Sequence, residues 1–163
     1  MASDKNSYLT FRVGDETFGV NVLKVMEIRE YSKPKNLPQT LPFVKGVVEY
    51  QDEIIPLVDT GVKFGMTPIK IDESTIVVVL QLINHMLSKT FRLAILVDEV
   101  SDVLECDDSE MKIISEDYSP GYIYATYSEG EKFIYILDSD VVFNEKEIIA
   151  ILDSVKKLGE EVK

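Results

Sequence analysis

Residues 41–61, LPFVKGVVEYQDEIIPLVDTG, are the stretch that decides the fold of this chain. Pro42 disfavours a helix at the residue before it, and two short apolar runs rich in β-branched residues follow. The polar pair Gln51-Asp52 separates these runs, so the stretch predicts a β-hairpin. Pro56 has no N–H for the ladder, so we expect the second strand to lie at a sheet edge or to be broken there.

The rest of the chain predicts many short strands. They are expected at residues 8–13, 17–20, 75–82, 91–97, 100–104, 122–127 and 133–137. Residues 22–29 fit a short helix or an irregular segment better than an alternating strand, and residues 106–120 are acidic and irregular. Such a series of strands, closed by one helix, predicts a mainly β fold built as a barrel or a pair of barrels.

The final helix has a clear start in the sequence. Asn144 is a favourable N-cap, and Glu147 follows at the spacing that completes a capping box. An apolar stripe at helical spacing comes next, and Gly159 is expected to end the helix.

The chain is acidic, with a formal net charge of −12 over 163 residues. Nucleic acids and anionic membrane surfaces are also negative, so this charge argues against both as partners. No apolar run is long enough to span a membrane, and the N-terminus has no apolar signal core. We therefore expect a cytoplasmic protein that does not insert into a membrane.

Neither a metal site, a cofactor nor a nucleophilic pair is predicted. The single cysteine, Cys106, cannot form an intrachain disulfide, and the acids beside it disfavour the thiolate, so we expect an unreactive loop thiol. His85, the single histidine, lies in an expected loop without a cysteine partner. The glycines are scattered and form no phosphate-binding loop.

Three apolar strands end in an aspartate, at Asp59, Asp98 and Asp138. Aspartate commonly ends a strand because its side chain bonds the backbone of the turn. The functional alternative is a cluster of carboxylates that binds a cation, which would require the three strand ends to converge.

The enzyme alternative rests on Asp59-Thr60-Gly61. This tripeptide resembles the catalytic motif of aspartic proteases, in which two aspartates share a proton and activate water. A chain with one such motif would need to dimerise. Val62 stands where that family has Ala or Ser. The family also needs a later strand with the pattern apolar-apolar-Gly, and neither Gly121 nor Gly130 follows two apolar residues. The protease is therefore the alternative from another class of function.

The central hairpin also resembles the signature hairpin of the CheW-like family, the scaffold domains of bacterial chemotaxis. The resemblance rests on Gly46-Val47 in the first strand, a polar turn, and a second strand of the form I-apolar-P-apolar-apolar-D. Flanking segments at residues 8–20, 22–29 and 95–104 agree with the family in the same order.

This resemblance implies two intertwined, small, five-stranded SH3-like β-barrels with a C-terminal helix and a groove between the lobes. Residues 8–158 would form one domain, with flexible termini at residues 1–7 and 159–163. The implied function is a non-catalytic adaptor. It would link the cytoplasmic tip of a methyl-accepting chemoreceptor, held in the groove, to the regulatory domain of a chemotaxis histidine kinase.

Six residues at family positions are expected to contact these partners: Val25, Glu27, Ile28, Val47, Val48 and Gln51. The apolar ones either line the groove or pack in the core. Glu27 stands at the family's acidic position, whereas Gln51 replaces an arginine that could pair with that acid. Gln51 can only form neutral hydrogen bonds, so a second interpretation is a CheW-like scaffold that assembles with itself or with other scaffolds in a variant array.

Overall fold

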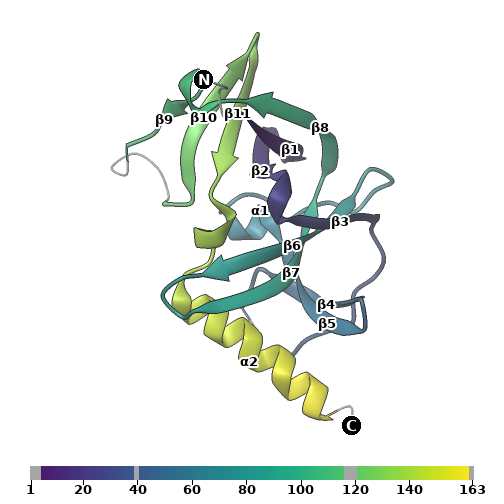
Figure 1. The fold of residues 1–163 in the computed structure, drawn as a ribbon. Helices are drawn as coiled ribbons and strands as arrows, with labels where there is room; N and C mark the ends of the chain where they lie inside the picture. Colours follow the sequence, from purple (N-terminus) through teal and green to yellow (C-terminus); the bar gives the residue numbers. More distant parts are fainter. Residues whose placement is uncertain (1–4, 39–40, 116–120, 162–163) are drawn as a thin grey trace.

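Two curled β-sheets form two lobes, and a long C-terminal helix runs beneath the second lobe (Figure 1). The computed structural model describes residues 5–38, 41–115 and 121–161. The mainly β fold with a C-terminal helix is confirmed. The predicted termini lie partly outside the described residues, and β1 already begins at Asn6.

Sheet A, the six-stranded sheet, has the strand order β8-β1-β2-β11-β10-β9. Its strands are β1 (Asn6–Val13), β2 (Glu16–Asn21), β8 (Glu99–Cys106), β9 (Lys112–Ile113), β10 (Ile123–Glu129) and β11 (Lys132–Leu137). Strand β11 pairs in parallel with β2, which joins the two ends of the chain in one sheet. The lobes are therefore intertwined, because sheet A takes strands from both sides of the segment that forms sheet B.

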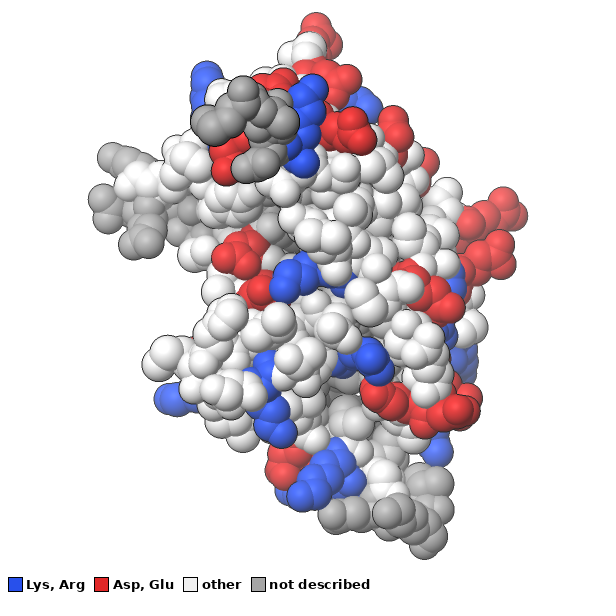
Figure 2. Space-filling view, viewed as in Figure 1, with Lys and Arg blue, Asp and Glu red and all other residues white. Residues whose placement is uncertain are grey.

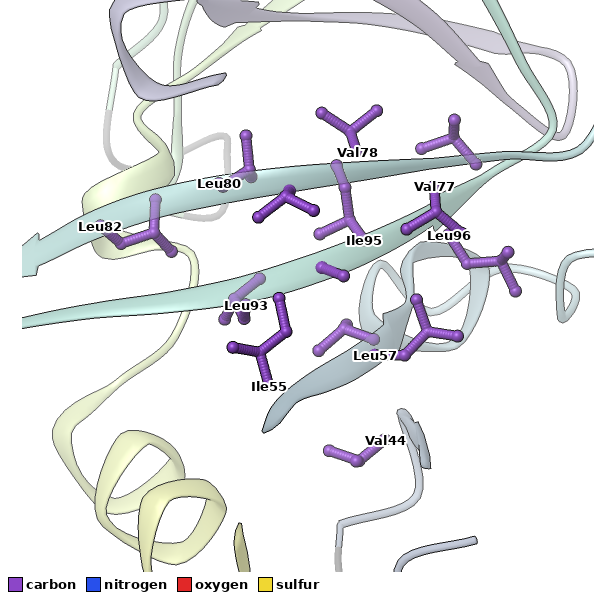
Figure 3. Close-up of a cluster of buried hydrophobic side chains, with 14 of the residues drawn as sticks. Val44, Ile55, Leu57, Val77, Val78, Leu80, Leu82, Leu93, Ile95 and Leu96 are labelled. Carbon is purple, nitrogen blue, oxygen red and sulfur yellow. The ribbon is translucent and has the colours of Figure 1, made fainter. Parts of the chain in front are cut away.

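Sheet B, the five-stranded sheet, has the order β3-β6-β7-β5-β4. Its strands are β3 (Val25–Glu30), β4 (Val44–Tyr50), β5 (Glu53–Asp59), β6 (Ile76–Asn84) and β7 (Lys89–Val97). Leu57, Leu93 and Leu96 are almost fully buried on the two neighbouring strands β5 and β7 (Figure 3). These central strands read as continuous apolar runs because they are covered on both faces.

Short helical turns connect the strands. They are the 3₁₀ turns η1 (Val22–Lys24), η2 (Asp108–Glu110) and η3 (Ser139–Val141), and the α-helical turn α1 (Thr60–Lys63). The long helix α2 (Glu145–Glu161) begins at the predicted capping box. The Asn144 N–H donates to Glu147 at 2.9 Å, and the Glu147 N–H donates to the Asn144 side chain at 2.8 Å.

The predicted central hairpin is confirmed as β4 and β5. Its turn residues Gln51 and Asp52 adopt positive φ angles of 46° and 65°, the left-handed conformation that a tight two-residue turn requires. Gly46 is needed for another reason. A Cβ atom at this position would lie 2.3 Å from the backbone oxygen of Lys35, which bridges to β4.

The expectation for Pro56 is wrong, because β5 is continuous and lies inside the sheet. Val47, opposite Pro56, exchanges backbone hydrogen bonds with Lys35 at 2.8 and 3.0 Å, so its polar groups point away from β5. The Val47–Pro56 pair is therefore not hydrogen-bonded, and the proline costs no bond to β4. On the other side, pairing with β7 begins only at Leu57.

Three other expectations are also wrong. Residues 25–30 form strand β3, and only Val22–Lys24 is helical. Helix α2 continues past Gly159 to Glu161. Cys106 ends strand β8 and is fully buried, so it is no loop thiol. Pairing between distant segments decided the first and third of these conformations, through β3 with β6 and β8 with β1.

The side chain of Lys63 joins sheet B, the connection to β10 and helix α2. Its ammonium lies 3.2 Å from Glu147 and within 6 Å of the ring centres of Phe43 (5.1 Å), Phe143 (5.4 Å) and Tyr122 (5.9 Å). Only 12% of the lysine side chain is exposed. The charge is thus held by one carboxylate and three aromatic rings, a favourable arrangement for a cation away from water.

Candidate partner-binding surface

Strand β3 and the turn before it carry an exposed apolar surface. Ile28 is 46% exposed and Met26 is 37% exposed, while Leu23 in η1 is 79% exposed. Val25 is partly buried and packs against the core. Exposed apolar side chains grouped on an edge strand are typical of a protein contact. We call Leu23, Met26, Glu27 and Ile28 the β3 surface.

The candidates on β4 and its turn lie in different environments. Val47 is 3% exposed and belongs to the core, and Val48 packs partly against it. Gln51 is exposed at the tip of the hairpin. The core-packing alternative therefore describes Val47, whereas Ile28, Glu27 and Gln51 remain accessible to a partner.

Sheet B curls so that a side chain on one edge strand reaches the backbone of the other. Strands β3 and β4 lie at opposite ends of the strand order, yet Arg29 on β3 donates to the backbone oxygen of Glu49 on β4 at 2.7 Å. This contact brings Glu27 and the hairpin turn to the same end of the lobe. The structure thus groups candidates that are more than twenty residues apart in the sequence.

Glu27 already has a partner within the chain. Arg29 donates from Nε at 2.7 Å, and its Nη2 lies 2.5 Å from the Glu27 carboxylate. Sequence reasoning missed Arg29 because residues two apart share a face only on a strand, and this segment was expected to be helical or irregular.

A second arginine supports the same end of the lobe. Arg92 on β7 contacts Glu53 at 3.1 Å and Gln81 at 3.2 Å. The guanidinium carbons of Arg29 and Arg92 lie 6.0 and 5.7 Å from the centre of the Tyr50 ring. Both arginines are therefore held by an aromatic ring as well as by hydrogen bonds.

A charged contact joins η1, which connects sheet A to sheet B, with η3, which follows the last strand of sheet A. Lys24 in η1 binds Asp140 in η3 at 2.8 Å, and the Ile83 N–H of β6 donates to the same carboxylate at 2.9 Å. Beside it, the Tyr8 and Tyr124 hydroxyls are 2.9 Å apart. Burial, reinforced by this hydrogen bond, raises the pKa of Tyr124 well above its usual range.

Asp59 is unsuited to the chemistry of an aspartic protease. It is fully buried, and its carboxylate accepts the N–H groups of Val62 at 3.2 Å and Ile69 at 3.1 Å. Lys45 lies 3.7 Å away. A carboxylate bonded to turn backbone and closed off from water cannot activate a water molecule, so the protease alternative is not supported.

The other strand-end aspartates also bond turn backbone. Asp98 accepts the N–H of Gly14 at 2.7 Å, and Asp138 accepts the N–H of Asp140 at 3.3 Å. Within residues 5–38, 41–115 and 121–161, no group of three or more acidic, histidine or cysteine side chains could hold a metal ion. The predicted bond to the local turn is therefore present at Asp59 and Asp138, whereas Asp98 bonds the distant turn between β1 and β2.

Cys106 is shielded from reagents. Burial raises the pKa of its thiol, and the nearby carboxylates of Glu110, Asp107 and Asp108 raise the pKa further. The sequence predicted that neighbouring acids disfavour the thiolate. In the structure burial is the larger cause and the acids are the second.

Charge is unevenly distributed over the molecule. Acidic side chains gather near the top and along the right-hand edge of the face in Figure 2.

No helix in the described part of the chain is both long and apolar enough to cross a membrane.

Two intertwined β lobes with a C-terminal helix and an exposed apolar edge strand characterise a class of two-lobed β-barrel domains. The model of the CheW-like domain matches residues 7–147. The chain belongs to the CheW-like family.

Relatives in this family match nearly the whole chain. The chemotaxis protein CheW of Klebsiella aerogenes is 31% identical over 153 residues, which cover 92% of this chain and 88% of that protein. The chemotaxis protein CheW of Rhizobium meliloti is 28% identical over 142 residues, covering 85% of this chain and 88% of its own length.

A solved structure has the same fold. The scaffolding protein TtCheW from Thermoanaerobacter tengcongensis superposes with a TM-score of 0.73 at 17% identity, covering 87% of this chain and 94% of that chain. This likeness confirms the predicted pair of small barrels as the fold, although sheet A has six strands where five were expected, because the short strand β9 adds to its edge.

Proposed function

We propose that this protein is a non-catalytic adaptor that couples chemoreceptors to a chemotaxis histidine kinase in bacterial signalling arrays. The observation that carries the proposal is the β3 surface, an exposed apolar strand edge on a CheW-like lobe. The expected partners are the cytoplasmic tip of a methyl-accepting receptor and the regulatory domain of the kinase, which places the protein in the cytoplasm.

The β3 surface suits a helical receptor tip. Met26 and Ile28 offer apolar side chains, and the Glu27–Arg29 pair offers both signs of charge along the same edge strand. Such a mixture of apolar anchors with a polar rim is the usual anatomy of a protein interface. Gln51, at the same end of the lobe, would contact the partner as a neutral residue.

The test is titration of the purified protein with a receptor cytoplasmic fragment and, separately, with a kinase regulatory domain. Binding to both supports the adaptor, and binding to neither contradicts it. The Ile28→Ser variant is expected to weaken receptor binding, because 46% of this side chain is exposed on the β3 surface.

The Ile149→Ser variant is the matched control. Ile149 is 54% exposed on helix α2, so its substitution removes a similar apolar area elsewhere. Equal loss of binding in both variants would show that the β3 surface is not the contact. Concentration-dependent self-association without receptor binding would instead favour the scaffold that assembles with itself.

A further inference from the structure

A groove separate from the β3 surface lies between the connection from β3 to β4 and strands of sheet B. It has a volume of about 310 Å³. Leu57, Ile69 and Leu96 form an apolar floor, and each is at most 7% exposed. Ile71, on one wall, is 45% exposed. The groove can therefore admit an apolar side chain from another molecule.

The rim of the groove is basic although the chain is strongly acidic. Lys33 and Lys45 line it, and no acidic residue does. Lys45 lies 3.7 Å from the buried Asp59, whereas none of the ion pairs in the described part of the chain involves Lys33. Lys33 is exposed, so its charge is available to a partner.

The surroundings keep this sign of charge. Exposed Lys35 and Lys70 adjoin the lining residues, and neither takes part in an ion pair among the described residues. The acids within two residues of the lining along the chain are Glu30, Asp59, Asp72, Glu73 and Asp98, which lie outside the lining. Asp72 is occupied by its own turn, because its Oδ1 accepts the Ser74 N–H at 2.7 Å.

The groove is pre-organised. One wall is fixed by the two hydrogen bonds between Lys35 and Val47, at 2.8 and 3.0 Å. The floor is fixed by Asp59, which accepts the Ile69 N–H with both oxygens at 3.1 and 3.2 Å. A rigid site loses little conformational entropy when a partner binds.

We infer that this groove binds an acidic segment of a partner protein, with one apolar side chain on the floor and its flanking carboxylates beside Lys33 and Lys45. Charge complementarity decides the occupant. A basic segment would meet lysines, and a nucleic acid or anionic bilayer would be repelled by the rest of a chain of net charge −12. The inference goes beyond the adaptor function, because it gives the lobe a second contact.

The test uses a blocked peptide with one leucine between two pairs of glutamates and a matched peptide with lysines in their place. Methyl resonances of Leu57, Ile69, Ile71 and Leu96 are followed by NMR during titration. The glutamate peptide is expected to shift these resonances with saturation, and more weakly at high salt. The lysine peptide is expected to leave them unchanged.

Lys33→Glu is expected to lower the affinity for the glutamate peptide about fivefold, which is the effect of about one exposed ion pair. Lys89→Glu is the matched control, because Lys89 is exposed at the start of β7 and lies outside the groove. It is expected to leave the affinity unchanged. No shift at millimolar peptide, equal shifts with both peptides, or equal losses in the two variants would each overturn the inference.

Two further arms exclude other occupants. Vesicles of phosphatidylglycerol are expected not to bind, and binding that Lys33→Glu abolishes would assign the groove to a membrane. Sedimentation is expected to show no self-association that depends on Lys33. Self-association that Lys33→Glu abolishes would mean that the groove holds a second copy of this chain. Either result would overturn the acidic-partner assignment.

Discussion

Arg29 binds the Glu27 carboxylate at 2.5 Å and also reaches the backbone oxygen of Glu49 at 2.7 Å. One side chain thus neutralises the acid of β3 and connects the two edge strands of sheet B. The family resemblance implies an arginine at the position of Gln51, which could pair with that acid. In this chain Arg29 holds the acid instead, from two residues further along the strand.

The first prediction concerns this arginine. Arg29→Gln is expected to lower the free energy of unfolding by about 1 kcal/mol, because a charge-assisted hydrogen bond across the sheet edges is lost at a partly exposed site. Urea denaturation measures the change. Lys157→Gln is the control, since its exposed pair with Asp153 on α2 should contribute less than about 0.5 kcal/mol. Similar losses in the two variants would contradict a closing role for Arg29.

Gln51→Arg is expected to change the affinity for receptor or kinase more than it changes the melting temperature. A positive charge beside Glu49, Asp52 and Glu53 reverses the local field, whereas a new exposed pair adds only about 0.2 to 1 kcal/mol of stability. Because Arg29 already occupies Glu27, the affinity change should be larger when Arg29 is also replaced by Gln. Titration of both variants at two salt concentrations is the measurement. Unchanged affinities at low salt would show that position 51 faces no partner.

The hairpin turn offers a stabilising substitution. Asp52 has a φ of 65°, which glycine adopts at no steric cost, so Asp52→Gly should raise the free energy of unfolding by about 0.5 kcal/mol. Glu49→Gly, within β4, should lower the free energy of unfolding, because glycine is unfavourable inside a strand. Equal and opposite shifts of the urea midpoint would fit this account. A loss of stability in Asp52→Gly would show that the Asp52 side chain contributes more than the strained φ costs.

Lys63 should be among the least replaceable charged residues of the chain. Lys63→Ala is expected to cost about 3 kcal/mol, because it leaves the Glu147 carboxylate without its cation and opens space between three rings. The side chain of Lys157 is 72% exposed, so Lys157→Ala should cost less than about 0.5 kcal/mol. Thermal unfolding of both variants decides the matter, and comparable shifts would refute a structural role for Lys63.

Stability is expected to fall in alkaline solution. Burial is the first cause that raises the pKa values of Cys106, Tyr8 and Tyr124 in the folded chain. The unfolded chain therefore releases these protons at lower pH than the folded chain does. Stability is full below the unfolded pKa values and declines as the pH rises above about 9.

Urea midpoints between pH 7 and 11 measure this decline. Tyr124→Phe should make it shallower, because one of the raised groups is removed. Tyr31→Phe is the control. Tyr31 lies in the β3–β4 connection, and the hydroxyl that bonds Tyr8 is that of Tyr124. An identical pH profile in wild type and Tyr124→Phe would contradict the linkage.

The sequence by itself determined the elements whose causes are local. The turn at Gln51-Asp52, the hairpin that it closes and the capping box of Asn144 and Glu147 all depend on residues a few positions apart. Their patterns also carried the family resemblance, since its signature is the same hairpin. Local spacing decides such features because the groups that interact are brought together by the chain's own geometry.

Only the tertiary structure decided what depends on distant partners. Residues 25–30 form a strand because β6 supplies the hydrogen bonds. Pro56 fits inside the sheet because β5 pairs with β7 only from Leu57 onward, so no N–H is needed at Pro56. The contact of Arg29 with Glu49 and the burial of Val47 also depend on how sheet B curls. The physical reason is that strand order and sheet curvature set which segments share a hydrogen bond or a core, and no short window of sequence contains both partners.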